Sequence, residues 1–139
     1  MTTTSGSRVA PGDRGATARR AARGYFDERA KGPLRNAVER TVLPWPGVER
    51  AVTFGCPSYR VGGELFAFVS NQGVVLTRLS AAEREHLRVR QPVAPFEANG
   101  RPVDGWAAVP VGAEDAYALR PYLRMSYEAV APSLTTASP

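Results

Sequence analysis

The spacing of apolar positions predicts two helices at the start of the chain. From Thr17, apolar residues recur at the spacing of one helix face: Ala18, Ala21, Ala22, Tyr25 and Phe26. Gly32-Pro33 then interrupts the pattern. Because proline suits a first helical position, a second helix is expected from Pro33 to Val42, ended by Pro44-Trp45-Pro46-Gly47.

The middle of the chain predicts an antiparallel β-meander. Alternating or continuous apolar runs indicate strands over 48–54, 58–61, 64–69 and 74–79. Gly62-Gly63 separates two of them, and both glycines tolerate the positive φ of a tight hairpin turn. The strand over 64–69 is apolar on both faces, so we expect it to be central, with its second face covered.

The last third of the chain alternates helical and turn signals. Ser80-Ala81-Ala82-Glu83 forms a capping box, so a short helix is expected to about Arg88. A long turn-rich loop and a last strand over 106–109 follow. A closing helical stripe comes next, in which Pro121 is expected to introduce a kink or start a second segment: Ala116, Leu119, Leu123, Tyr127 and Val130.

These elements predict an α+β fold in two layers. An antiparallel meander of about five strands would carry the N- and C-terminal helices on one face. We expect a single domain over residues 16–131, with a basic helix over 17–31 as an extension of it. The segments 1–15 and 132–139 are poor in large apolar residues and are expected to be disordered tails. An exposed second sheet face, or the sheet edge, would be the surface of a homodimer.

Length and composition exclude several classes of protein. The 139 residues suffice for one domain. No apolar run approaches the roughly 18 residues of a transmembrane helix, and the N-terminus lacks the order of a secretory signal. With one cysteine, Cys56, and one histidine, His86, the chain has neither a disulfide framework nor a His-rich metal site. We therefore expect a cytoplasmic protein with no cofactor, no membrane partner and no identifiable small-molecule ligand.

The net charge of +5 comes from the first 40 residues, which hold nine bases against four acids. Arg19, Arg20, Arg23 and Lys31 could neutralise phosphates, so nucleic acid is a candidate partner of residues 17–31. The alternative is a solvated tail and helix face that keep the protein soluble. Arginine supplies 17 of the 18 basic residues, which a GC-biased genome explains as readily as a selected surface.

Three stretches of the chain resemble the TfoX N-terminal-domain family over roughly residues 33–131. They are PGVE (46–49) with TFGCP (53–57) and VGGELFA (61–67), PFEANGRP (95–102) with GW (105–106), and LRMSY (123–127). They are similar to the family's "MFGG…VNGKMFA" and "PF…GRPM.GW" runs and its closing helix. The MmcQ/YjbR-like proteins are the nearest confusable group.

The resemblance implies a small α+β domain with regulatory or nucleic-acid-linked work, and it brings no catalytic residues. Three departures matter. Cys56 stands where the family usually has Gly, Val103 stands where it has Met, and the second, helix-hairpin-helix-like domain of the full-length regulators is missing. We therefore expect a non-enzymatic binding or regulatory module. A nucleic-acid binder is the alternative.

Each candidate site residue has a structural interpretation as well as a functional one. If Cys56 is a nucleophile, it needs a base, for which His86 is the candidate. If it is a buried thiol that fills a turn, it needs no catalytic partner. Arg101 could bind an anion or clamp its loop to a carboxylate, and we favour the clamp. An aromatic platform for bases would need interleaved cations, so we favour core packing for the four candidate rings: Tyr59, Phe66, Phe68 and Trp106.

Overall fold

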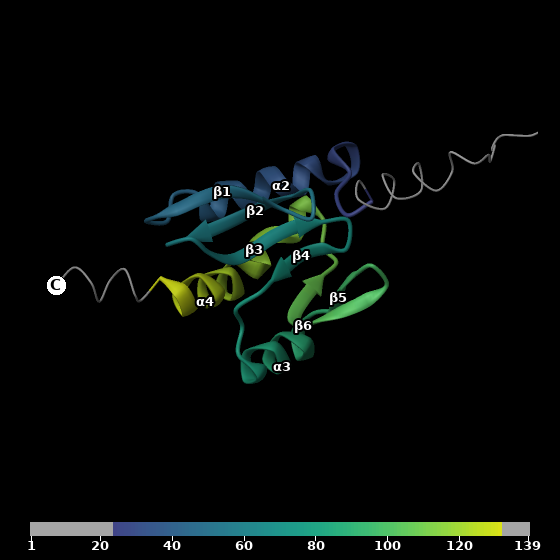
Figure 1. The fold of residues 1–139 in the computed structure, drawn as a ribbon. Coiled ribbons are helices and arrows are strands. Elements are labelled where there is room, and N and C mark those ends of the chain that lie inside the picture. Colours follow the sequence, from purple (N-terminus) through teal and green to yellow (C-terminus); the bar gives the residue numbers. More distant parts are fainter. Residues whose placement is uncertain (1–23, 132–139) are drawn as a thin grey trace, which may run out of the picture.

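A six-stranded antiparallel sheet organises the protein (Figure 1). The structure is a computed structural model, and it describes residues 24–131. The strands lie in the order β1-β2-β3-β4-β6-β5. In chain order the elements are α2 (Glu28–Val42), β1 (Val48–Thr53), β2 (Cys56–Val61), β3 (Glu64–Ser70), β4 (Gly73–Leu76), α3 (Ala81–Arg90), β5 (Ala94–Ala98), β6 (Arg101–Val109), the 3-10 helix η1 (Ala113–Leu119) and α4 (Arg120–Val130).

The α+β class is confirmed, but the sheet has one strand more than the expected five. The extra strand comes from the segment expected to be a loop, which forms the hairpin β5–β6 around Asn99-Gly100. Both turn residues have positive φ, as a two-residue turn requires. Pro95 is tolerated because β5 is an edge strand, where a missing N–H need not break a ladder.

Helix α2 begins earlier than the Pro33 start that the second helical pattern predicts. Gly24 and Tyr25 form a turn, and the side chain of Asp27 accepts a hydrogen bond from the Arg29 N–H to cap α2. Tyr25 is therefore not on a helix face, and residues 17–23 lie outside the described residues, as do the two expected tails. The expectation that α2 starts at Pro33 is wrong, because Asp27 caps the helix earlier and Pro33 lies inside it.

Several local predictions are confirmed. Ser80 and Glu83 form the capping box of α3, with both reciprocal hydrogen bonds present. Gly62 and Gly63 both have positive φ between β2 and β3. Pro121 falls in the first turn of α4, so the closing stripe does start a second segment there. Strand β1 ends at Thr53 rather than Phe54, because Phe54 has φ 54° and begins the turn to β2.

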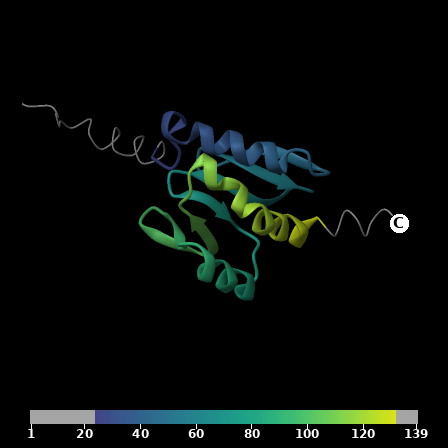
Figure 2. The same ribbon diagram turned by 180° about the vertical axis from the view of Figure 1, so that it is seen from behind.

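One face of the sheet is covered by α2 and α4 (Figures 1 and 2). Strand β3 contributes Phe66 to this face, where its ring meets Tyr127 of α4 edge-on at 5.6 Å. The helices bury a stripe of side chains there: Leu34, Val38 and Val42 from α2, and Tyr122, Leu123 and Tyr127 from α4. Helix α3 lies at the lower end of the sheet near β6 (Figure 1), and its Leu87 is buried in the same core.

The opposite face carries a second, smaller core, as the two-sided apolar pattern of β3 predicts. Its fully buried residues are Cys56, Phe68, Val75, Phe96 and Ala108. Side chains at the rim cover them: Tyr25, Phe26, Leu65, Ala98, Val103 and Trp106. The cover comes from the hairpin β5–β6 and from the segment before α2 rather than from a helix layer.

No helix within residues 24–131 is both long enough and apolar enough to cross a bilayer.

Candidate binding cleft

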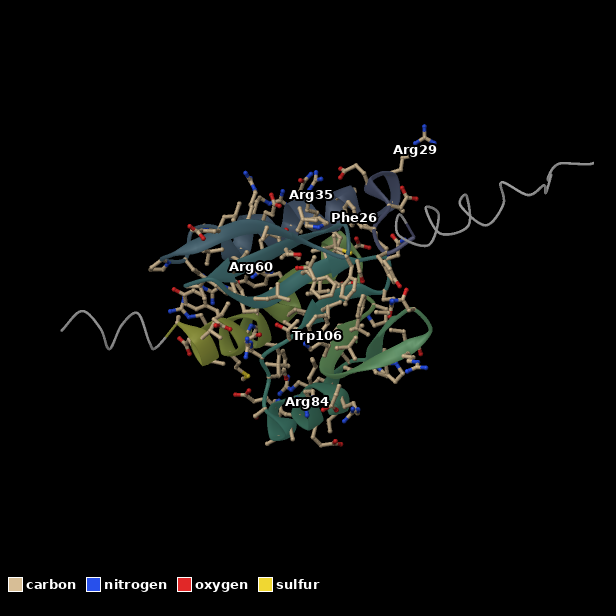
Figure 3. All side chains as sticks on the ribbon, in the orientation of Figure 1. Phe26, Arg29, Arg35, Arg60, Arg84 and Trp106 are labelled. Carbon is tan, nitrogen blue, oxygen red and sulfur yellow. The ribbon has the colours of Figure 1, made fainter. Side chains whose placement is uncertain are left out.

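A cleft of about 320 Å³ lies between α3 and the hairpin β5–β6, and we call it the α3–β6 cleft. Arg84 of α3 and Trp106 of β6 both line this cleft (Figure 3). Its walls are formed by Arg84, Arg88, Val93, Ala94, Pro95, Pro102, Val103, Asp104, Gly105, Trp106 and Ala107. The stretch PFEANGRP…GW therefore supplies much of one wall.

The capped helix α3 supplies the cationic wall. Arg84 and Arg88 are four residues apart and so share one helix face. The Arg84 Nη1 donates to the Leu79 carbonyl at 2.7 Å, which fixes its guanidinium beside the chain that enters the helix. Arg88 Nη1 contacts Glu85 Oε1 at 2.8 Å. Arg84 is half-buried and Arg88 is exposed.

A bulge in β6 supplies the opposite wall. Pro95 pairs with Ala107 and Glu97 pairs with Pro102, so β6 has more residues than β5 between these pairs and must arch outward. Gly105 lies in the arch with φ 82°, a conformation that favours glycine. A Cβ built on Gly105 would lie 3.8 Å from Arg84 Nη1, so the bare backbone of the bulge faces the guanidinium.

Trp106 links this wall to the second core. Its ring lies 5.5 Å from Phe68, 6.0 Å from Phe96 and 6.2 Å from Phe54, measured between centroids. These contacts hold the indole from below, while its other parts line the cleft. Within residues 24–131 the indole N–H donates to no side chain or carbonyl, and it is not a buried unsatisfied group. The tryptophan is thus a rigid apolar wall with a free donor.

The charges at the cleft suit binding better than acid–base chemistry. Two guanidinium groups face one carboxylate, Asp104, among apolar side chains. Guanidinium groups stay protonated and donate hydrogen bonds in a planar fork, so they hold anions but do not transfer protons. The arrangement can therefore hold an anionic group against an aromatic wall.

The structure does not bring Cys56 and His86 together. Cys56 is fully buried in the second core, where its Sγ donates to the Tyr25 carbonyl at 3.4 Å, and burial raises the pKa of its thiol to about 12. His86 instead contacts the Tyr122 hydroxyl through Nδ1 at 2.8 Å. A thiol with a raised pKa is a poor nucleophile at neutral pH. In the described part of the chain, no group of three or more acidic, His or Cys residues could hold a metal ion.

Of the residues predicted to bind nucleic acid, only Lys31 lies within the described part of the chain. Arg19, Arg20 and Arg23 lie outside the described residues. Lys31 is on α2, half-exposed, beside a separate hollow that Gln91 and Asp115 also line.

Arg101 begins β6 and is exposed at the hairpin turn. Its side chain forms no hydrogen bond or ion pair within residues 24–131, so its guanidinium is open to an external anion.

Core packing is the correct interpretation for three of the four candidate aromatic rings. Tyr59 and Phe66 lie in the helix-covered core, and Phe68 lies in the second core. Of the four, Trp106 alone reaches the cleft. Sequence reasoning missed the two arginines that accompany it, although the capping box fixes the helix phase that puts Arg84 and Arg88 on one face.

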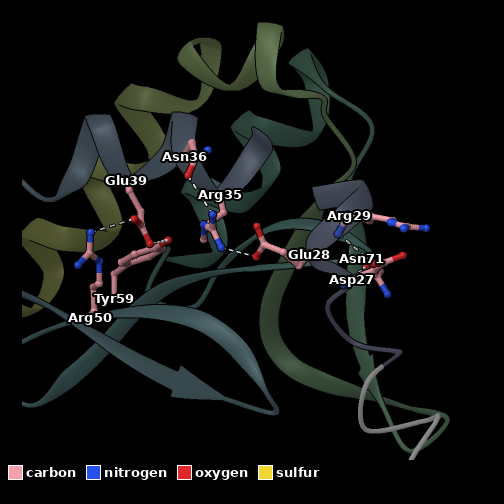
Figure 4. A network of polar contacts seen from close by, with 9 residues as sticks. All are labelled: Asp27, Glu28, Arg29, Arg35, Asn36, Glu39, Arg50, Tyr59 and Asn71. Carbon is pink, nitrogen blue, oxygen red and sulfur yellow. Dashed lines mark hydrogen bonds and ion pairs between the residues drawn. The ribbon is translucent and has the colours of Figure 1, made fainter. Parts of the chain in front are cut away.

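A polar network on α2 has a structural role (Figure 4). Glu39 accepts hydrogen bonds from the Tyr59 hydroxyl at 3.0 Å and from Arg50 at 3.3 Å. Burial, and then the neighbouring Glu39 carboxylate, raise the pKa of the Tyr59 hydroxyl above its usual range. Nearer the start of α2, Arg35 pairs with Glu28. The network ties the helix to strands β1 and β2, and Glu39 and Arg50 also line an open hollow between α2 and β1.

In the comparisons with known proteins, no family model matches the chain, and neither a curated protein nor a solved structure matches it. The resemblance to the TfoX N-terminal-domain family therefore rests on the residues quoted for it.

Proposed function

We propose that the protein is a non-enzymatic binding or regulatory module of the TfoX N-terminal type, acts in the cytoplasm, and engages its target through the α3–β6 cleft. One observation carries the proposal. Two arginines of one helix face and a tryptophan held by three other rings line the same hollow. Hollows with apolar walls and a few convergent polar groups are where proteins bind ligands.

Affinity capture from the native host tests this function. The bait would be the full chain, and its matched variants would be Arg84→Gln with Arg88→Gln, and Arg90→Gln on the same helix. Arg90 is exposed and does not line the cleft, so it controls for loss of one helix charge. We expect the double variant to lose a partner that the control retains. Equal capture by both variants contradicts the role of the cleft.

Nucleic-acid binding is the second candidate, and the segment before α2 favours it. The Tyr25 hydroxyl accepts from the Asn99 N–H at 2.7 Å, and the Tyr25 carbonyl accepts from the Asn71 N–H at 2.7 Å. These bonds hold the chain beside the β5–β6 turn, next to Arg101. In the sequence, Arg23 precedes Tyr25 by two residues, so the basic segment leads directly into this anchored stretch.

A salt titration of a single-stranded and a duplex oligonucleotide tests this candidate. Phosphate neutralisation makes log K fall linearly with log salt, by about 0.7–0.9 per contact. We expect Arg19→Gln, Arg20→Gln and Arg23→Gln together to lower the slope by about two to three, and Arg101→Gln to lower it further by about one. Arg60→Gln on β2 is the charge-matched control. A slope near zero for the unaltered chain contradicts nucleic-acid binding.

A homodimer would use the β1 edge rather than the second sheet face. The centre of that face is filled by the second core, whereas no strand of the described chain pairs with the outer side of β1, and Val52 is 71 % exposed there. Light scattering at high concentration should then give twice 15.0 kDa, and Val52→Lys should halve it. A mass of one chain throughout contradicts the dimer.

A further inference from the structure

We propose that the α3–β6 cleft binds a small aromatic monocarboxylate, with its ring against Trp106 and its carboxylate on Arg84 and Arg88. The inference rests on the proposed function, because it takes this cleft to be the binding surface. It adds the chemical class of the ligand.

The size of the cleft selects a small ligand. A volume of about 320 Å³ lies at the lower end of the range for ligand pockets, which is about 300–1,000 Å³. One ring with one or two substituents fits this space, whereas a larger ligand would extend beyond the cleft. Val93, Pro95 and Val103 give the ring apolar contacts and offer it no side-chain hydrogen bonds.

The charge of the lining selects a single negative charge. The lining holds Arg84, Arg88 and Asp104, and Arg88 is already paired with Glu85, so Arg84 is the lining guanidinium with no ion pair within residues 24–131. A monoanion neutralises it, while a phosphate dianion would leave an excess of negative charge beside Asp104. Guanidinium donors also match the two oxygens of a carboxylate in a planar, bidentate pair.

Arg84 is oriented before any ligand arrives. Its Nη1 is held by the Leu79 carbonyl, which leaves the other N–H groups of the guanidinium available. The bare backbone of Gly105 leaves room beside it. A side chain fixed in this way loses little conformational entropy on binding, so its hydrogen bonds favour the bound state more strongly.

Trp106 selects a flat, apolar body. Its ring is held by Phe68, Phe96 and Phe54, so it cannot swing away when a ligand enters. Aromatic rings stack in offset or edge-on arrangements on such a wall. An aliphatic carboxylate of the same charge would lack this contact and should bind less tightly.

NMR titration of the full-length chain with benzoate tests the inference, because the two tryptophans give two indole N–H signals. Trp45 is buried in the helix-covered core and serves as an internal reference, and Trp106→Phe assigns the signals. We expect benzoate to shift the Trp106 signal and leave Trp45 in place. Benzamide, which has the same ring without the charge, and inorganic phosphate should each bind at least about ten-fold more weakly.

Matched variants complete the test. Arg84→Gln and Arg88→Gln should each weaken benzoate about ten-fold or more, while Arg90→Gln should not change it. Arg88 contacts no backbone group, so its variant keeps the test valid if the loss of the Arg84–Leu79 bond unfolds α3. Three results would overturn the ligand class: no shift at Trp106, equal binding of benzamide, or equal effects of the Arg88 and Arg90 variants.

The two proposals can fail separately. If the Arg84/Arg88 double variant loses a captured partner but benzoate does not bind, the binding module stands and the ligand class is wrong. If benzoate binds as expected but capture is unchanged, the ligand site stands and the cleft is not the partner surface.

Discussion

The two faces of the sheet are covered by different kinds of structure. Helices α2 and α4 cover one face with aliphatic and tyrosine side chains from successive helical turns. These side chains form one continuous core with the sheet. The other face is covered by single side chains from turns, from a strand bulge and from the segment before α2. Its centre is as fully buried as the first core, yet its rim is partly exposed: Phe54 keeps 41 % of its surface.

The difference has a consequence for function. The hollows beside α2 lie at its edges and leave the helix-covered core closed, whereas the α3–β6 cleft reaches a side chain of the second core. Trp106 shows this directly, because one part of its ring fills the second core and another lines the α3–β6 cleft. Stability and binding are therefore coupled on this face, and they are separate on the other.

The largest effect is expected in the helix-covered core. Phe66 is fully buried and meets Tyr127 edge-on, so Phe66→Ala removes a large apolar side chain and leaves a cavity. Such substitutions lower the free energy of unfolding by about 3–5 kcal/mol. Urea denaturation followed by circular dichroism measures this loss. Val89→Ala, at an exposed position of α3, should stay within about 0.5 kcal/mol, and a similar loss in both variants would contradict the assignment of the core.

The second core should become less stable at high pH. Burial raises the pKa of the Cys56 thiol to about 12, against about 8.5 for a free thiol. The folded state therefore holds its proton more tightly, so this stabilisation is complete below pH 8.5 and is lost as pH rises toward 12. The slope from this group approaches about 1.4 kcal/mol per pH unit.

Cys56→Ala isolates that slope, since it removes the thiol and leaves the titrating tyrosines unchanged. We expect the difference in unfolding free energy between the two proteins to shrink with pH between 9 and 12. A difference that stays constant over this range would show that the thiol is not buried in the folded state.

Phe54 tests how the rim is held. It has φ 54° in the β1–β2 turn, a conformation that costs a non-glycine residue about 1–2 kcal/mol, while its ring contacts Tyr25, Phe96 and Trp106. Phe54→Ala loses the ring and keeps the strain, whereas Phe54→Gly loses the ring but relieves the strain. We expect the glycine variant to be more stable than the alanine variant by about 1 kcal/mol. The melting temperatures of the two variants test this order. A more stable alanine variant would contradict the positive φ of Phe54.

Much of the fold could be predicted from local signals, because these depend on neighbours in the chain. The capping box of Ser80 and Glu83 and the turn of Gly62 and Gly63 are satisfied by atoms a few residues away. The hairpin β5–β6 could not be predicted in this way. Its prolines indicate a loop, and they are tolerated because Pro95 lies on an edge strand and Pro102 precedes the part of β6 that pairs with β4.

The cleft escaped prediction for a related reason. Arg84 and Arg88 look like ordinary surface arginines of a short helix, and Trp106 looks like a strand residue. Only the bulge in β6, set by the pairings of Pro95 and Glu97, brings the tryptophan toward α3. The register of two strands decides this, and no local pattern specifies it. The alternating pattern likewise predicts Phe54 on a strand, because an aromatic residue is rarely found in a turn with positive φ.

The smallest effect is expected at the segment before α2. Tyr25→Phe keeps the ring contacts with Phe54 and Phe96 but removes the hydroxyl that accepts from the Asn99 N–H. Because the turn is exposed, water replaces the lost partner, and unfolding should become easier by only about 0.5–1.5 kcal/mol. Hydrogen exchange is the sharper measurement. The Asn99 amide should exchange faster in the variant, while the amides of α4 on the helix-covered face keep their protection. A similar loss of protection in α4 and at Asn99 would show that the covers of the two faces open together. The second core would then have no separate local stability.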